Sequence, residues 1–250
     1  MRDVEKVLQF RNDISPFLVH LTRDIGANSA KSNLKSILKS KTLKYGDTPI
    51  SDARFRYPLE KLTTKKKRLF FSAVSFTETP LGEIHNLLEI RKRSVDLKPY
   101  GLVFLKERLR SKGVSPVFYI NNMKGDQNDA VEALCSLIDT HPRVALKVTP
   151  FIALFGKLLS PMGGTAQNRK RIDFTWEREW RYASRKPRFK FTRRDLFIGL
   201  CPDEDIDEFE TEFKTQYKPL RFIDPRRTMK WYAEQLLDAK DQSKLGHSAI

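Results

Sequence analysis

The segment FTWEREWRY, residues 174–182, places two glutamates, Glu177 and Glu179, two residues apart among tryptophans and arginines. Carboxylates in such a position can stabilise positive charge that develops in a reacting substrate. They can equally form ordinary ion pairs with Arg178, Arg181 or lysines on adjacent strands. Which of the two applies depends on the side chains that lie opposite this segment.

A second group of chemically useful side chains lies near the N-terminus, in FLVHLTR at residues 17–23. His20 and Thr22 are two residues apart, so on a strand both side chains face the same way. Together they can hydrogen-bond a ribose or an amide. Later, LFFSAVSFTETPL places Ser72, Val74 and Phe76 on one strand face. If these strands neighbour the glutamate segment, a histidine, an aromatic ring and a carboxylate could line one cleft.

Each of these residues also has a purely structural interpretation. A histidine on a strand is commonly a hydrogen-bonded core residue, and β-branched Thr22 is ordinary in a strand. Phe76 is an ordinary core residue by type. Trp176 and Trp180 could simply pack the edge of a sheet. Both interpretations stay open on sequence alone.

The charge of the chain points to polyanions. The 250 residues carry a net charge of +16 and the pI is about 9.8. Such a field favours nucleic acid, a nucleotide, an anionic membrane or an acidic protein as a partner, although it also fits a basic surface without a specific ligand. Two basic clusters could contact phosphates without reading sequence. They comprise Lys65, Lys66, Lys67 and Arg68, and then Arg169, Lys170 and Arg171.

Other classes of site find no support in the sequence. The two cysteines and four histidines show no metal-ligand spacing, so no metal is expected. The N-terminal stretch has no uninterrupted apolar region typical of a signal peptide. The longest apolar run, VALKVTPFIALFGKLL, is broken by Lys147, Pro150 and Lys157, so no membrane span is expected. These features favour a cytoplasmic protein.

Strand and helix patterns are mixed without regular alternation, which predicts an α+β fold with a mixed or antiparallel sheet and flanking helices. Glycine-rich phosphate loops of the GxGxxG or GxxxxGK[ST] type do not occur. We expect one domain over residues 1–250, with a core at about 15–225 and a frayed tail at 241–250. Predicted helices cover 29–46, 83–93, 128–139, 150–159, 204–217 and 225–240; predicted strands cover 15–22, 115–122, 177–184, 188–192, 196–200 and 219–224. The segment 100–113 is expected to begin as a buried strand and to pass into a short helix capped by Gly113.

The order H-x-T, then NLxSIL and a glycine, at residues 20–46 resembles the opening of ADP-ribosyltransferase-like proteins. The resemblance implies that His20, with Thr22 and Arg23, would hold NAD, and that Phe76 and Tyr100 are candidate aromatic contacts. Glu177-x-Glu179 is similar to the E-x-E pair of that superfamily. By this resemblance Glu179 would be the catalytic carboxylate and Glu177 would position the acceptor. Loss of nicotinamide develops positive charge on the ribose, which a carboxylate stabilises.

Four segments in order resemble the AbiGi-type abortive-infection proteins of bacterial phage defence: FLVHLTRD, FSAVSFTETPL, YGLVFLKERLRSKGVSPVFYI and EREWRY. The similarity covers roughly residues 15–185. That family is labelled as the antitoxin half of a two-gene system, which implies a toxin partner. SFTET departs from the serine-threonine-serine strand of arginine-targeting transferases, and a transferase-like fold can serve as a binding scaffold.

Two hypotheses therefore follow from the sequence. The first is an NAD-dependent enzyme that transfers ADP-ribose to nucleic acid or protein through His20 and Glu179. The second is a non-catalytic basic module that neutralises a toxin or binds nucleic acid. Under the first, Glu179→Gln abolishes activity and leaves stability nearly unchanged. Under the second, charge reversals in the basic clusters break the function.

Overall fold

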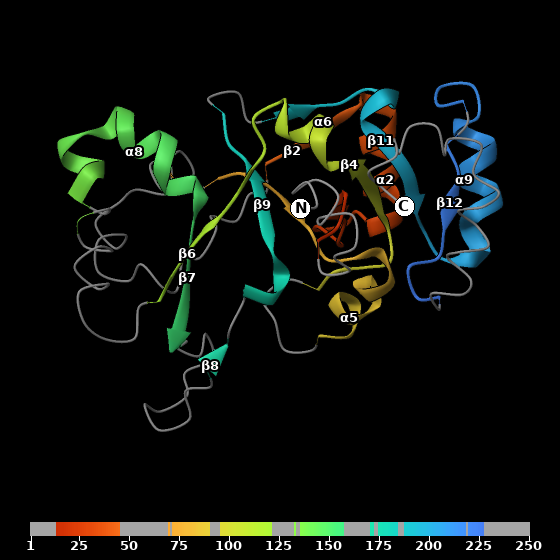
Figure 1. Ribbon diagram of the computed structural model, residues 1–250. Helices are drawn as coiled ribbons and strands as arrows, with labels where there is room; N and C mark the ends of the chain where they lie inside the picture. The colour runs from red at the N-terminus through yellow and green to blue at the C-terminus, as the bar shows by residue number, and fades with distance from the viewer. Residues whose placement is uncertain are drawn as a thin grey trace, which may run out of the picture. The chain divides into compact units, whose positions relative to one another are not determined.

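The computed structural model describes residues 14–45, 70, 72–90, 96–121, 133, 136–157, 171–172, 175–184, 188–218 and 220–227 (Figure 1). The chain divides into two compact units that are interleaved in sequence. Unit 1 consists of Met1–Thr42, Phe76–Lys112 and Lys190–Ile250, and unit 2 of Leu43–Ser75 and Gly113–Phe189. That the whole chain forms one domain stays a prediction.

Unit 1 is built on a mainly antiparallel sheet with the order β12-β11-β4-β1-β3. β4 pairs antiparallel with both β1 and β11, and β12 pairs parallel with β11. β3 enters unit 1 at Phe76 and pairs antiparallel with β1 through Thr77 and Val19. The predicted α+β class with a mainly antiparallel sheet is confirmed. The strands are β1 (Phe17–Leu21), β3 (Val74–Thr77), β4 (Gly101–Leu105), β11 (Leu196–Leu200) and β12 (Phe222–Ile223).

The core of unit 1 follows from the apolar strands. Phe17, Val19 and Leu21 alternate along β1 and join one buried cluster with Ile84 and Leu87 of α5 (Ile84–Glu89). Nearly every residue of β4 and β11 is buried, because both faces of these central strands are covered. The shorter elements of unit 1 are η1 (Leu81–Glu83), α6 (Lys106–Arg110) and η5 (Arg193–Asp195).

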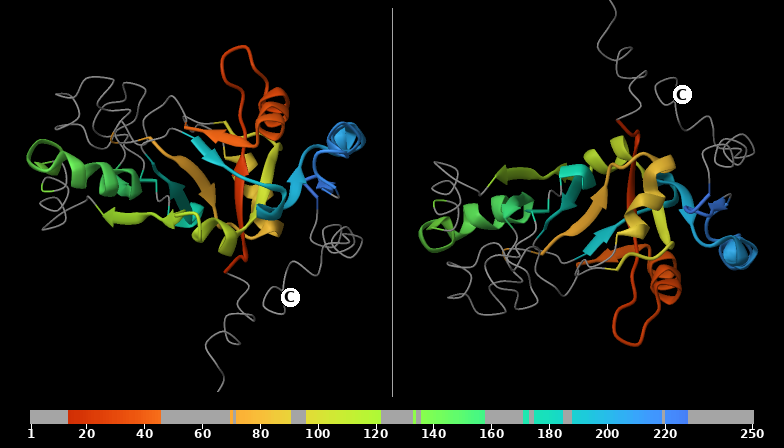
Figure 2. Two further views of the ribbon diagram at one scale, coloured as in Figure 1. Left: turned by 90° about the horizontal axis from the view of Figure 1, so that it is seen from above. Right: turned by 90° about the horizontal axis from the view of Figure 1, so that it is seen from below.

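Two helices of unit 1 are joined by a series of ion pairs. Lys31, Lys35 and Lys39 recur every four residues along α2 (Ala30–Ser40), so they lie on one face of that helix. Their partners are Asp205 at the end of η6 (Asp203–Asp205), and Glu208 and Glu212 of α9 (Ile206–Phe213). α9 also packs beside β12, with the rings of Phe209 and Phe222 5.1 Å apart (Figures 1 and 2).

Unit 2 contains shorter pieces of sheet. β5 (Ser115–Pro116) pairs antiparallel with β9 (Glu179–Tyr182). β6 (Phe118–Asn121) pairs parallel with β7 (Ile152–Lys157), which pairs antiparallel with β8 (Arg171–Ile172). Phe70, Ile138, Ala145 and Ile152 form a buried cluster. The remaining elements are β2 (Thr42–Lys44) paired with β10 (Arg188–Lys190), α8 (Pro142–Val148), η2 (Thr149–Phe151) and η4 (Thr175–Glu177).

Two of the predicted helices, over 150–159 and 225–240, do not appear as helices in the described residues. The helix predicted over 150–159 is wrong: η2 ends at Phe151 and β7 begins at Ile152. A short apolar run fits a buried strand as well as a helix, and Pro150 separates α8 from the strand. Of the helix predicted over 225–240, residues 225–227 form a turn or bend, and the part from residue 228 on lies outside the described residues, as does the predicted tail.

Candidate functional site

The glutamate segment is not one continuous strand as predicted. Glu177 is the last residue of η4, and β9 begins at Glu179. Between them Arg178 has a left-handed backbone with φ of 44°, and its N–H donates to the carbonyl of Thr175 at 3.1 Å. Glu177 and Glu179 therefore lie on two different local structures, and the i, i+2 spacing does not place them on one strand face.

Glu179 is held by Arg181 within unit 2. The Nε and Nη2 of Arg181 donate to the two carboxylate oxygens of Glu179 at 2.9 and 2.7 Å. The Nη1 of the same guanidinium donates to the carbonyls of Pro150 and Ile152, both at 2.9 Å. The Arg181 side chain is only 3% exposed. We call this arrangement the Glu179–Arg181 clamp; it ties β9 to the start of β7.

The backbone of Glu179 is also engaged. Its N–H donates to the hydroxyl of Tyr119 at 2.7 Å, and its carbonyl accepts from the N–H of Val117 at 3.1 Å. Burial raises the pKa of Tyr119 to about 12. Glu179 thus has partners on its N–H, its carbonyl and both carboxylate oxygens, all from within unit 2, as expected for a residue that fixes local structure.

His20 and Phe76 lie on neighbouring strands of unit 1. Their ring centroids are 5.8 Å apart at a tilt of 59°. Phe76 is 2% exposed and also makes an edge contact with Phe104, which in turn contacts Phe191. Phe76 is therefore part of a buried aromatic row, with the half-buried His20 at one end. The structure brings this predicted pair together, while Glu177 and Glu179 belong to unit 2.

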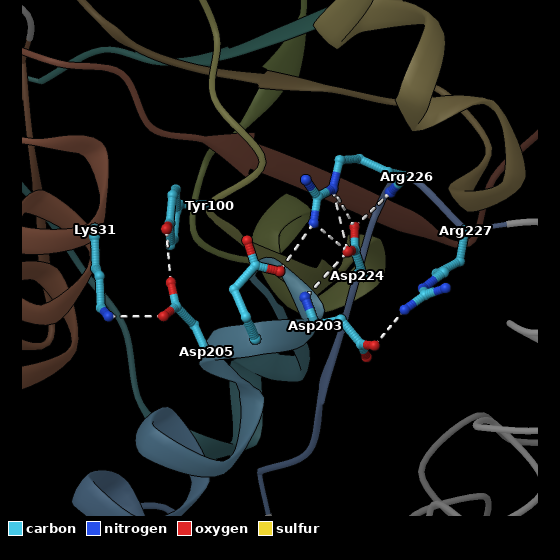
Figure 3. A network of polar contacts seen from close by, with 8 residues as sticks. Lys31, Tyr100, Asp203, Asp205, Asp224, Arg226 and Arg227 are labelled. Atoms are coloured by element: carbon cyan, nitrogen blue, oxygen red, sulfur yellow. Dashed lines mark hydrogen bonds and ion pairs between the residues drawn. The ribbon is translucent and has the colours of Figure 1, made fainter.

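The other predicted NAD contacts in unit 1 have structural partners. The Thr22 hydroxyl is 3.1 Å from both the Ala30 and Tyr100 carbonyls, which it can reach as a donor. The Tyr100 hydroxyl donates to Asp205 at 2.6 Å, and Lys31 donates to the other oxygen of that carboxylate at 2.7 Å (Figure 3). Burial, with the Asp205 hydrogen bond, raises the pKa of Tyr100. Arg23 is half-buried, and its carbonyl accepts from an Asn33 amide.

The two basic clusters fall almost entirely outside the described residues. For Arg171 the structure gives only its place in β8. Their role in phosphate binding stays a prediction. The residues outside the description are Lys65, Lys66, Lys67, Arg68, Arg169 and Lys170.

One polar network of unit 1 was not singled out from the sequence. Arg226 donates to both carboxylate oxygens of buried Asp224, at 2.9 and 2.6 Å, and the Asp203 N–H donates to the same carboxylate at 3.0 Å (Figure 3). Arg227 pairs with the Asp203 carboxylate. A hollow of about 470 Å³ is lined by these residues and Glu204. The acidic PDED segment and the DPRR segment could have indicated this network. Each of its three carboxylates is paired with Arg226 or Arg227, so the network offers no evident ligand site.

In the described part of the chain, no group of three or more His, Cys, Asp or Glu side chains is arranged to hold a metal ion. Among the helices of the described residues, none has the length and apolar character needed to cross a membrane.

Comparison with known protein families gives a match over the central part of the chain. A family described as "Putative abortive phage resistance protein AbiGi, antitoxin" matches residues 54–200, which is more than half of the chain. The matched range includes the Glu179–Arg181 clamp and excludes His20. No curated protein and no solved structure matches the chain.

Proposed function

Since the chain belongs to the AbiGi family of abortive phage resistance antitoxins, we propose that it works as a non-catalytic binding protein that neutralises a toxin in phage defence. The family description supplies the antitoxin role. The Glu179–Arg181 clamp is the observation that favours binding over catalysis.

The clamp argues against a catalytic Glu179 on chemical grounds. A carboxylate that stabilises a developing cation must face the substrate with at least one oxygen. Both oxygens of Glu179 accept from a guanidinium that is itself fixed by two backbone carbonyls. Releasing the carboxylate would leave a buried arginine without its counter-charge, which costs several kcal/mol, roughly 3–5. Each catalytic cycle would have to supply this free energy to separate the Glu179 carboxylate from Arg181.

NAD-dependent ADP-ribosyl transfer on a transferase-like fold is the second candidate function. The half-buried His20, at the end of the aromatic row and 5.8 Å from the Phe76 ring, is the observation in its favour, because a histidine in this position can hydrogen-bond a ribose. It requires His20, Glu177 and Glu179 to act on one NAD molecule, with ADP-ribose passing to nucleic acid or protein. NAD is the cofactor of this candidate only.

One experiment separates the two candidates. The first partner to test is the protein encoded by the neighbouring gene, since the family is described as an antitoxin. Co-expression with this chain is expected to restore growth that the neighbouring protein arrests, and the purified chain is expected to release no nicotinamide from NAD. Nicotinamide release that is lost in Glu179→Gln and kept in Arg181→Met would overturn the antitoxin proposal. Arg181→Met is the matched control, because it breaks the same clamp and keeps the carboxylate.

A further inference from the structure

The described residues expose few large apolar side chains. They are Ile25 in unit 1 and Phe118, Val144 and Trp176 in unit 2. Phe118 is the most exposed at 68%, and Trp176 is 41% exposed. Apolar surface left in contact with water is unfavourable, and two exposed aromatic side chains in one unit indicate a contact surface.

Phe118 extends an apolar face of unit 2 to the surface. Its register partner across the β6–β7 pair is Ile152, which is buried in the unit 2 cluster. Two residues further along β6, Ile120 packs against the same cluster. Register partners and alternate residues of a strand share one face of a sheet. The apolar face therefore begins in the core and ends in solvent at Phe118.

The glutamate segment lies next to Phe118. In the β5–β9 pair, Pro116 is exposed, Val117 is buried, and the register partner of Pro116 is Trp180. The Val117 N–H bonds to Glu179, so the chain reaches Phe118 directly beside the start of β9. Trp176 lies on η4, the turn that leads into this strand. Two aromatic residues exposed to solvent thus flank the junction of η4, β9 and β6, and we call Phe118 and Trp176 the aromatic surface.

The charges around the aromatic surface favour a protein over a nucleic acid. Arg181 is buried in the clamp and offers no guanidinium to solvent, and the residues that directly follow Trp176 are the oppositely charged Glu177 and Arg178. A nucleic-acid site instead gathers cations beside its stacking rings to contact the phosphates. Exposed Trp and Phe among mixed charges are instead typical of the centre of a protein interface.

The charge of the whole unit indicates the chemistry of that protein. Unit 2 holds 20 of the 47 Lys and Arg residues but 10 of the 31 Asp and Glu residues, a net charge of +10 out of +16. Such a field steers an acidic partner toward the unit before short-range contacts form. We propose that the aromatic surface of Phe118 and Trp176 is the docking site for an acidic face of the toxin protein; this rests on the antitoxin function proposed above.

The test measures binding of the purified neighbouring-gene protein to the wild-type chain and to Phe118→Ala, Trp176→Ala and Ile25→Ala by titration calorimetry. Interface hot spots cost at least about 2 kcal/mol on truncation, so each of the first two variants is expected to weaken binding by about 30-fold. Ile25→Ala is the matched control: it removes a side chain that is 49% exposed in unit 1, and binding is expected to stay within about threefold of wild type. Binding is also expected to weaken as salt is raised.

Each outcome has a separate meaning. Loss of binding in Phe118→Ala and Trp176→Ala, with folded spectra and an unaffected control, supports the docking site. Equal binding by all variants overturns the docking site and leaves the antitoxin function intact. Absence of binding by the wild type overturns the antitoxin function and this inference with it. A labelled single-stranded oligonucleotide that loses binding in the same two variants, while the protein partner keeps its affinity, would identify a nucleic-acid site and overturn the inference.

Discussion

Removing either member of the Glu179–Arg181 clamp is expected to destabilise the protein. Arg181→Met deletes four hydrogen bonds and leaves a carboxylate and the carbonyls of Pro150 and Ile152 without their donor. The Glu179 side chain is only 15% exposed, so water replaces the donor poorly. Breaking a buried pair by removing one partner costs about 3–5 kcal/mol, and we expect a loss in this range for Arg181→Met.

Glu179→Gln is expected to cost less, about 2–3 kcal/mol. The amide keeps one acceptor oxygen, and the guanidinium keeps its two backbone carbonyls, but one charge-assisted hydrogen bond and the counter-charge are lost. The double variant Glu179→Gln/Arg181→Met should be more stable than the sum of the single losses predicts, by about 1–2 kcal/mol, because the second change removes a group that the first had already left unpaired.

The assay is urea unfolding followed by circular dichroism, with the midpoint compared at constant slope. The matched control is Glu107→Gln, which breaks an exposed Glu107–Arg110 pair of 3.0 Å on α6. That pair is worth less than about 0.5 kcal/mol, because solvent screens it. If Glu179→Gln and Glu107→Gln unfold at the same urea concentration, the Glu179 carboxylate does not stabilise the fold. The reasoning against a catalytic Glu179 is then refuted.

Two further predictions concern unit 1. Gly199→Ala is expected to destabilise the protein by about 1–3 kcal/mol, because a Cβ at this position would lie 2.1 Å from the Phe222 ring. Urea unfolding measures this loss of stability. The double variant Gly199→Ala/Phe222→Leu should recover part of the lost stability, because the smaller side chain relieves the clash. Hydrogen bonds from Lys31 and Lys35 lower the pKa of Glu208 from 4.5 to about 2. Its stabilisation is therefore fully present above pH 4.5 and is lost as the pH falls toward 2, so Glu208→Gln should flatten the pH dependence of stability in that window, and an unchanged slope would contradict the ion pairs.

The elements that the sequence predicted well have strong local patterns. The helix over 29–46 was identified from Leu34, Ile37 and Leu38, and α2 covers Ala30–Ser40. The strand over 196–200 is β11. The prediction for 150–159 failed because its apolar residues form a short, nearly continuous run, in which no period distinguishes a helix from a strand. What makes Ile152–Lys157 a strand is its pairing with β6 and β8, which are distant in sequence.

The candidate site was predictable only in part, for a similar reason. The sequence left open whether the strand of His20 neighbours the strand of Phe76; β1 pairs with β3, and the rings of His20 and Phe76 are 5.8 Å apart. An ion pair within the glutamate segment was one of two open interpretations, and Glu179 forms it with Arg181. The carbonyls of Pro150 and Ile152, about 30 residues away, could not be assigned from local sequence, because backbone acceptors carry no residue-type signal.

The structure gives different roles to the two kinds of residue that made FTWEREWRY conspicuous. The side chains of Glu179 and Arg181 satisfy each other and two backbone carbonyls inside unit 2, so their charges are paired within the fold. Trp176 remains at the surface, 41% exposed. A rigid, internally satisfied strand is a good support for exposed aromatic rings, because the rings lose little conformational entropy when a partner binds. The same segment that resembles a catalytic strand is therefore better suited to hold a contact surface in place.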